Sequence, residues 1–139
     1  MDYKKFGDKY IVRLEIGEEI VESLTNLIKK EGIKLGRVSG IGAVDYAKIG
    51  LFSTRTKKYH SKELEGDMEI VNLAGNISTM DGKEYLHLHI AVGDEDLNLF
   101  GGHLDSATVS ATAEIVIDLI DGEVDREVGK DLGINLIKF

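Results

Sequence analysis

Glycine is the residue that divides this chain, because the sequence contains 16 glycines and no proline. The segments between the glycines are short, and no low-complexity linker or fixed-period repeat groups them into separate units. A length of 139 residues suits one compact domain and is too short for two ordinary ones. We therefore predict a single domain over residues 1–139.

Most of these segments have the alternating apolar pattern of β-strands. The predicted strands cover residues 10–16, 35–39, 46–54, 68–77, 85–92 and 108–119. The dipeptide Asp81-Gly82 predicts a tight hairpin turn. The last strand is long enough for its edge to pair between subunits.

One segment has helical periodicity. Gly17-Glu18-Glu19 opens it, and Gly32 ends it. Between them Ile20, Leu24, Leu27 and Ile28 form a single apolar stripe. Because strands outnumber helices and regular βαβ alternation is missing, we predict an α+β fold, a mostly antiparallel sheet with one main helix packed on it.

The net charge of −8 bears on which partners the chain can bind. A surface that binds duplex DNA must neutralise phosphates with Lys and Arg, and a negative overall field repels a polyanion. The basic run Arg55–Lys58, with Lys62 nearby, is interpreted as a solvated loop or strand edge. The charge therefore disfavours direct binding to DNA.

No segment of the sequence predicts export or membrane insertion. No apolar run approaches the roughly 18 residues of a transmembrane helix, and the first residues lack the apolar core of a secretory signal. The absence of cysteine excludes disulfides and thiolate metal sites. We expect a cytoplasmic protein without a membrane partner.

Two histidines lie at alternate positions of the strand predicted at residues 85–92. His87 and His89 share one face, whereas Leu88 and Ile90 belong to the opposite, buried face. Neighbours on one face of a strand are roughly 6.5 to 7 Å apart, so two imidazoles can lean together onto one ion. The His-x-His pattern is therefore a candidate two-point metal clamp. His60, in a polar stretch, is interpreted as a surface residue.

His103 is the candidate third ligand, provided that Gly101-Gly102 turns the chain back beside the strand. Three imidazoles with a fourth position open suit zinc, although such ligands determine the type of divalent ion only weakly. Ligation needs neutral imidazole, so affinity should fall below about pH 6. The alternative on spacing alone is three ordinary histidines on a polar strand face.

The sequence leaves open whether this site is catalytic. The acids closest in sequence are Asp94, Glu95, Asp96, Asp105 and Glu114. Glu114 interrupts an otherwise small or apolar run and is a candidate for the surroundings of the metal or for ligand binding, as are Gly101 and Gly102. No nucleophile motif is visible. Ser39–Gly42 lacks the Lys-Ser/Thr ending of a phosphate loop and instead predicts a bulge or a close crossing of chains.

An ordered set of short motifs resembles the PPC (plant and prokaryote conserved) domain of the free-standing prokaryotic type. The motifs lie at residues 14–19, 36–43, 69–78, 86–89, 100–104 and 111–114. The resemblance implies a strongly bent, mostly antiparallel sheet, assembly into a homotrimer, and metal binding through His87, His89 and His103. Members of this family are often labelled as predicted DNA-binding proteins, which implies a role in transcription.

Two departures weaken the DNA interpretation. Plant relatives contact DNA through an AT-hook with an Arg-Gly-Arg-Pro core, and this chain has no proline. The plant contact motif Gly-Arg-Phe-Glu-Ile-Leu corresponds here to residues 66–71, where Asp67 replaces the arginine. Three functions remain open: a metal-binding, DNA-associated regulator, a metal-dependent enzyme or small-molecule binder with its site at the histidines, and a trimeric interaction scaffold.

Overall fold

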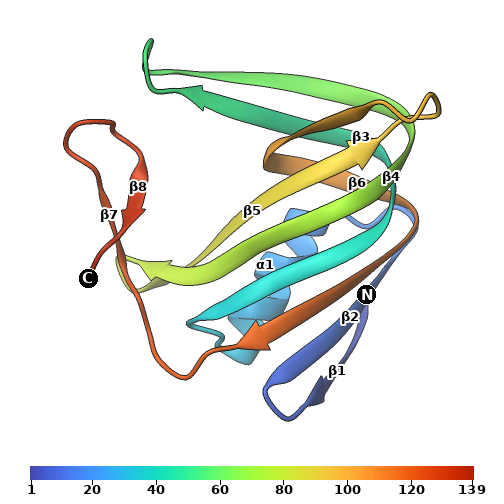
Figure 1. Ribbon diagram of the computed structural model, residues 1–139. Coiled ribbons are helices and arrows are strands. Elements are labelled where there is room, and N and C mark those ends of the chain that lie inside the picture. Colours follow the sequence, from blue (N-terminus) through green and yellow to red (C-terminus); the bar gives the residue numbers. More distant parts are fainter.

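The computed structural model describes all 139 residues, which form one large bent antiparallel sheet, a single helix against it and a separate two-stranded hairpin near the C-terminus (Figure 1). The elements are β1 (Asp2–Phe6), β2 (Lys9–Glu15), α1 (Ile20–Glu31), β3 (Gly36–Ser53), β4 (Lys58–Met80), β5 (Lys83–Gly93), β6 (Leu99–Leu119), β7 (Arg126–Val128) and β8 (Asn135–Ile137). The α+β class, the antiparallel sheet and the single main helix are as predicted. No helix is long and apolar enough to cross a membrane.

The large sheet has the order β1-β2-β6-β3-β4-β5, and β5 also pairs with β6. The sheet can bend back on itself because β3, β4 and β6 are 18, 23 and 21 residues long and carry register shifts. One shift lies between Gly40 and Gly42, where we expected a bulge or a close crossing. A Cβ on Gly42 would lie 2.3 Å from the carbonyl oxygen of Thr112, so the two backbones meet there.

The strands are longer than the sequence predicted. The strands predicted at residues 35–39 and 46–54 fall on one continuous strand, β3, which runs from Gly36 to Ser53, and residues 68–77 are only part of β4. The short strands β1, β7 and β8 were not predicted, because each carries little apolar alternation. We expected the strand at residues 108–119 to have an edge that pairs between subunits. This expectation is wrong, because this part of β6 pairs with β2 on one side and β3 on the other.

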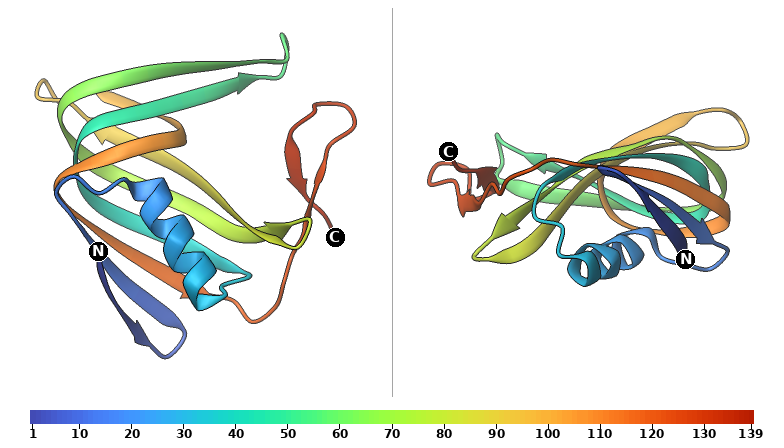
Figure 2. Two further views of the ribbon diagram at one scale, coloured as in Figure 1. Left: turned by 180° about the vertical axis from the view of Figure 1, so that it is seen from behind. Right: turned by 90° about the horizontal axis from the view of Figure 1, so that it is seen from below.

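The helix covers one face of the sheet (Figure 2). The predicted stripe of Ile20, Leu24, Leu27 and Ile28 is buried in the core. Glu19 caps the start of the helix by accepting hydrogen bonds from the backbone of Val21 and Glu22, and also from that of Ala107 on β6. Gly32 ends the helix in the left-handed conformation, with φ of 64°.

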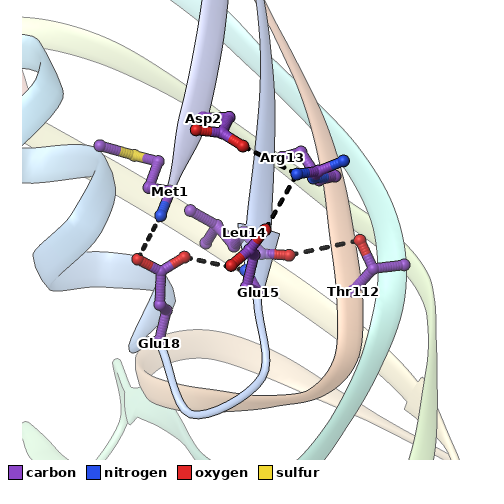
Figure 3. A network of polar contacts seen from close by, with 7 residues as sticks. All are labelled: Met1, Asp2, Arg13, Leu14, Glu15, Glu18 and Thr112. Atoms are coloured by element: carbon purple, nitrogen blue, oxygen red, sulfur yellow. Dashed lines mark hydrogen bonds and ion pairs between the residues drawn. The ribbon is translucent and has the colours of Figure 1, made fainter.

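Polar contacts fix the first strands beside the start of the helix (Figure 3). The N-terminal amine donates to Glu18, whose other carboxylate oxygen accepts from the backbone of Glu15. Arg13 bridges Asp2 and Glu15 on the exposed face of β1 and β2. These contacts hold the N-terminal hairpin, which lies far along the sheet from the histidines.

Two turns have the predicted character. Asp81 and Gly82 both have positive φ, 52° and 73°, as a tight hairpin turn requires. Residues 55–57 of the basic run lie in the exposed turn between β3 and β4, with Lys57 at φ 53°, and Lys58 begins β4. The interpretation of this run as a solvated loop is therefore confirmed.

Candidate metal centre

The alternation predicted for β5 places its histidines on the face away from the core. Leu88, Ile90 and Val92 are buried, with at most 3% of each exposed. His87 is half-buried and His89 is exposed. The burial of the leucine and isoleucine side chains therefore fixes the direction in which both imidazoles point.

His103 reaches the same place from β6, where it lies directly opposite His89 in the register. The expected turn at Gly101-Gly102 is absent, because both glycines lie within β6 and pair with Ala91 and Ile90. The chain reverses earlier, where Asp94 accepts hydrogen bonds from the backbone of Asp96 and Asn98.

Gly102 has a different role, which is to let β3 approach β6. A Cβ on Gly102 would lie 2.6 Å from the carbonyl oxygen of Gly50. Because Gly50 pairs with His103, this close approach also fixes the position of β6 where it carries the third imidazole.

The three imidazoles form one cluster. Their ring centroids are 5.2 Å apart for His87 and His89, 5.1 Å for His87 and His103, and 5.7 Å for His89 and His103. One ring nitrogen from each lies within 4.8 Å of the other two. Three nitrogen donors in this arrangement fit a divalent ion such as zinc and leave a fourth tetrahedral position for a ligand.

Burial keeps two of these rings neutral. Desolvation, and after it the charges of His103, Arg126 and His89, together lower the pKa of His87 to about 4. Desolvation also lowers the pKa of His103, although Asp105 opposes that shift. Neutral imidazole is the form that ligates metal, so the pocket favours the ligating state near neutral pH.

Tyr59 and Asp105 lie beside His103. The Tyr59 hydroxyl donates to Asp105 Oδ1 over 2.8 Å, and this oxygen lies 4.0 Å from His103 Nε2. Burial and then the bond to Asp105 raise the pKa of Tyr59 to about 12, so the phenol stays protonated. Asp105 was a candidate only because it lies close to His103 in sequence, and nothing in the sequence indicated Tyr59.

The cluster lies in a cleft of about 460 Å³. One wall is the end of the β3–β4 hairpin, with Leu51, Phe52 and Tyr59. Another is the C-terminal hairpin of β7 and β8, which stands apart from the large sheet in Figure 1 and contributes Ile134 and Asn135. Lys57 Nζ donates to the carbonyl oxygen of Asp131 over 2.6 Å, which ties the two walls together.

Arg126 anchors the C-terminal hairpin to the sheet. Only 6% of this residue is exposed. Its guanidinium donates to Ser78 Oγ, to Asn76 Oδ1 and to the carbonyl oxygen of Asn135, and it lies 4.6 Å from the centre of the Tyr85 ring. Neither this arginine nor the hairpin was identified from the sequence, because the contacts span about 50 residues.

The remaining candidate residues lie elsewhere. Glu114 is exposed and pairs with Arg13 and Ile41, beside a separate hollow of about 400 Å³ that Ile11 and Asn72 also line. It does not line the histidine cleft within this chain. His60 is exposed on β4, as predicted for a surface residue.

A family model described as the Plants and Prokaryotes Conserved (PCC) domain matches residues 1–121. Among curated proteins, the bifunctional protein GlmU of Synechococcus sp. (strain JA-3-3Ab) is 32% identical over 110 residues. The matched region is 78% of this chain but spans only 16% of the relative's length.

Solved structures resemble the whole chain. A candidate DNA-binding protein from Bacteroides thetaiotaomicron is 41% identical, with a TM-score of 0.97 over 99% of this chain and 96% of the other. A protein from Archaeoglobus fulgidus described as metal-containing is 31% identical, with a TM-score of 0.87 over 100% and 99%. A plant- and prokaryote-conserved (PPC) protein from Pyrococcus horikoshii is 34% identical, with a TM-score of 0.86 over 99% and 94%.

Proposed function

Because the chain belongs to the Plants and Prokaryotes Conserved domain family, we propose that it is a metal-binding member whose ion is held by His87, His89 and His103. The observation that carries this proposal is the convergence of three imidazole nitrogens within 4.8 Å. A relative of the same fold and 31% identity is described as metal-containing, which supports the assignment. Three nitrogen donors with an open fourth position suit zinc, although such ligands determine the type of divalent ion only weakly.

The chain's own residues would prepare the site in three ways. The pocket keeps His87 neutral, so the imidazole need not lose a proton on binding near neutral pH. Asp105, held by Tyr59, lies 4.0 Å from His103 Nε2, close enough for a small movement to let the carboxylate orient a ligating imidazole. A bound divalent ion would supply Lewis acidity at the position left for a ligand.

Zinc binding by the purified protein tests the proposal. Equilibrium dialysis should give one zinc per chain, and His89→Ala should remove it without unfolding the protein, because His89 is exposed. His60→Ala is the matched control, since His60 is also an exposed histidine on a strand. Equal zinc content in both variants would contradict the assignment.

The protein acts as a homotrimer in this proposal, as the family resemblance implies. The sheet face opposite α1 has no covering layer, and Ile11 and Ile41 expose 46% and 58% of their surface there. Both isoleucines line the hollow that Glu114 also lines. Contacts between subunits on this face would bury the hollow and its apolar residues. Sedimentation equilibrium measures the assembly, and a monomer at micromolar concentration would contradict it.

Binding to DNA is the second candidate, favoured by the description of the Bacteroides relative. The exposed basic turn at residues 55–58 is the surface that could meet phosphates, and the net charge of −8 opposes it. Duplex binding that weakens steeply with salt, and further in Lys58→Ala, would support this role. No binding at low salt would exclude it.

A further inference from the structure

The histidine cleft has apolar lining residues in addition to its three imidazoles. Leu51 and Phe52 from the end of β3 and Ile134 from the C-terminal hairpin line it. Leu51 exposes 67% of its surface and is not part of the hydrophobic core. A cleft of about 460 Å³ lies within the size range of small-molecule sites, which combine apolar walls with a few polar groups.

A buried positive charge lies beside this cleft without a counter-ion. The three hydrogen-bond partners of Arg126 are all neutral, namely Ser78, Asn76 and the backbone of Asn135. Asp125, its neighbour in sequence, accepts a hydrogen bond from Thr79 instead. A buried charge without an opposite charge is unfavourable, so an anion nearby would stabilise it. The guanidinium stacks on Tyr85, which itself lines the cleft.

Tyr85 also has an unused hydrogen-bond donor. Its hydroxyl oxygen accepts from Asn135 Nδ2 over 3.1 Å, and its own hydrogen has no acceptor within the chain. A phenol hydroxyl in this position can donate to a ligand oxygen. The cleft therefore combines an apolar wall, a free donor and positive charge on one side.

We propose that the cleft binds a small organic anion, namely a carboxylate with an apolar body. The carboxylate group would bind the metal and the Tyr85 hydroxyl, and the apolar body would pack against Phe52 and Ile134. This inference rests on the proposed metal site. It adds the class of ligand. It also gives a role in selecting the ligand to the C-terminal hairpin, which lies beyond the residues 1–121 that the family model matches. The overall charge of −8 would meanwhile disfavour polyanions at the same site.

Isothermal titration calorimetry on the zinc-loaded protein tests this inference with three probes. Benzoate should bind about tenfold or more tightly than acetate, because its ring leaves water. Benzamide, which has the same ring without the charge, should bind at least about tenfold more weakly than benzoate. Ile134→Ala and Phe52→Ala should each reduce the ratio of benzoate to acetate affinity, with zinc content unchanged.

Leu136→Ala is the matched control, because Leu136 lies on the same hairpin but does not line the cleft. Tyr85→Phe should weaken the binding of both carboxylates more than that of benzamide, because a hydrogen bond to a charged carboxylate is stronger than one to a neutral carbonyl. Equal affinities for benzoate and acetate, or for benzoate and benzamide, would overturn the ligand class while leaving the metal site intact. A protein that holds no zinc would overturn the metal site and this inference together.

Discussion

Tyr59 and Asp105 lie on different strands, 46 residues apart, and are joined by a hydrogen bond of 2.8 Å. Tyr59 occupies the space over Gly50, where a Cβ would come within 1.9 Å of its hydroxyl oxygen. The hydrogen bond holds Asp105 Oδ1 at 4.0 Å from His103 Nε2. A glycine on β3 thus makes room for the phenol that positions a carboxylate beside a candidate metal ligand.

Tyr59→Phe should weaken zinc binding, because Asp105 loses the partner that orients it. Loss of such supporting contacts typically lowers metal affinity about 10- to 100-fold, and we expect the lower end here. Competition with a chromophoric chelator measures the change. Tyr46→Phe is the control, since Tyr46 is half-buried and, unlike the other four tyrosines, its hydroxyl forms no hydrogen bond within the chain. Equal losses in the two variants would show that Tyr59 has no specific role.

Gly102→Ala should destabilise the protein, because the new Cβ would press against the Gly50 carbonyl at 2.6 Å. Overpacking of this kind commonly costs about 1–3 kcal/mol, and separation of β3 from β6 would displace His103. Urea unfolding and zinc affinity should both report the change. Gly93→Ala is the control, since its Cβ would meet only ordinary contacts, the nearest at 3.4 Å. If Gly102→Ala changes neither the free energy of unfolding nor the zinc affinity, the strands separate at little cost.

The metal-free protein should lose stability in acid partly through His87. Its folded-state pKa of about 4 lies below the ordinary 6.5, so the unfolded chain binds more protons between these values. The contribution is fully present above pH 6.5 and is lost as the pH falls towards 4. Because the ring is only half-buried, we expect about 1 kcal/mol rather than the full value of the shift.

Comparison of the metal-free wild type with His87→Gln isolates that contribution from the acidic groups that also titrate. The free energy of unfolding of the wild type should fall relative to the variant between pH 6.5 and 4. Parallel curves across this window would show that the pocket does not hold His87 neutral.

Arg126→Met should release the C-terminal hairpin while the large sheet stays folded. The substitution removes three hydrogen bonds and leaves the buried Ser78 hydroxyl unpaired, at a cost of about 2–3 kcal/mol to the docking of the hairpin. Hydrogen exchange at residues 126–137 should accelerate strongly. Arg55→Met, at an exposed turn, should leave exchange unchanged. Retained protection in Arg126→Met would mean that other contacts hold the hairpin.

Local patterns were sufficient to predict much of this fold. Alternation along residues 85–92 gave the buried face of β5, and helical spacing from Ile20 to Ile28 gave the side of α1 that meets the sheet. The same alternation indicated that His87 and His89 share a face. The order of the strands was not predictable in this way, because the pairing of β6 with β2, β3 and β5 depends on contacts distant in sequence.

The residues around the histidines could not be predicted either, because their contacts also join parts of the chain that are distant in sequence. Tyr59 and Arg126 reach the site from hairpins far along the chain, and neither lies in a pattern that indicates a site. Gly101 and Gly102 were predicted to form a turn, but they lie within β6 and allow close packing of the strands. Glu114 was singled out because it interrupts an apolar run, and it lies in another hollow.

Native mass spectrometry of the protein, purified without chelator or affinity tag, tests the central claim most directly because it weighs the ion and the assembly together. We predict a trimer with one divalent ion per chain, an ion that is lost in His89→Ala and kept in His60→Ala. A metal-free protein that stays metal-free after incubation with zinc would contradict the account, and would make the three histidines ordinary residues on the wall of a cleft.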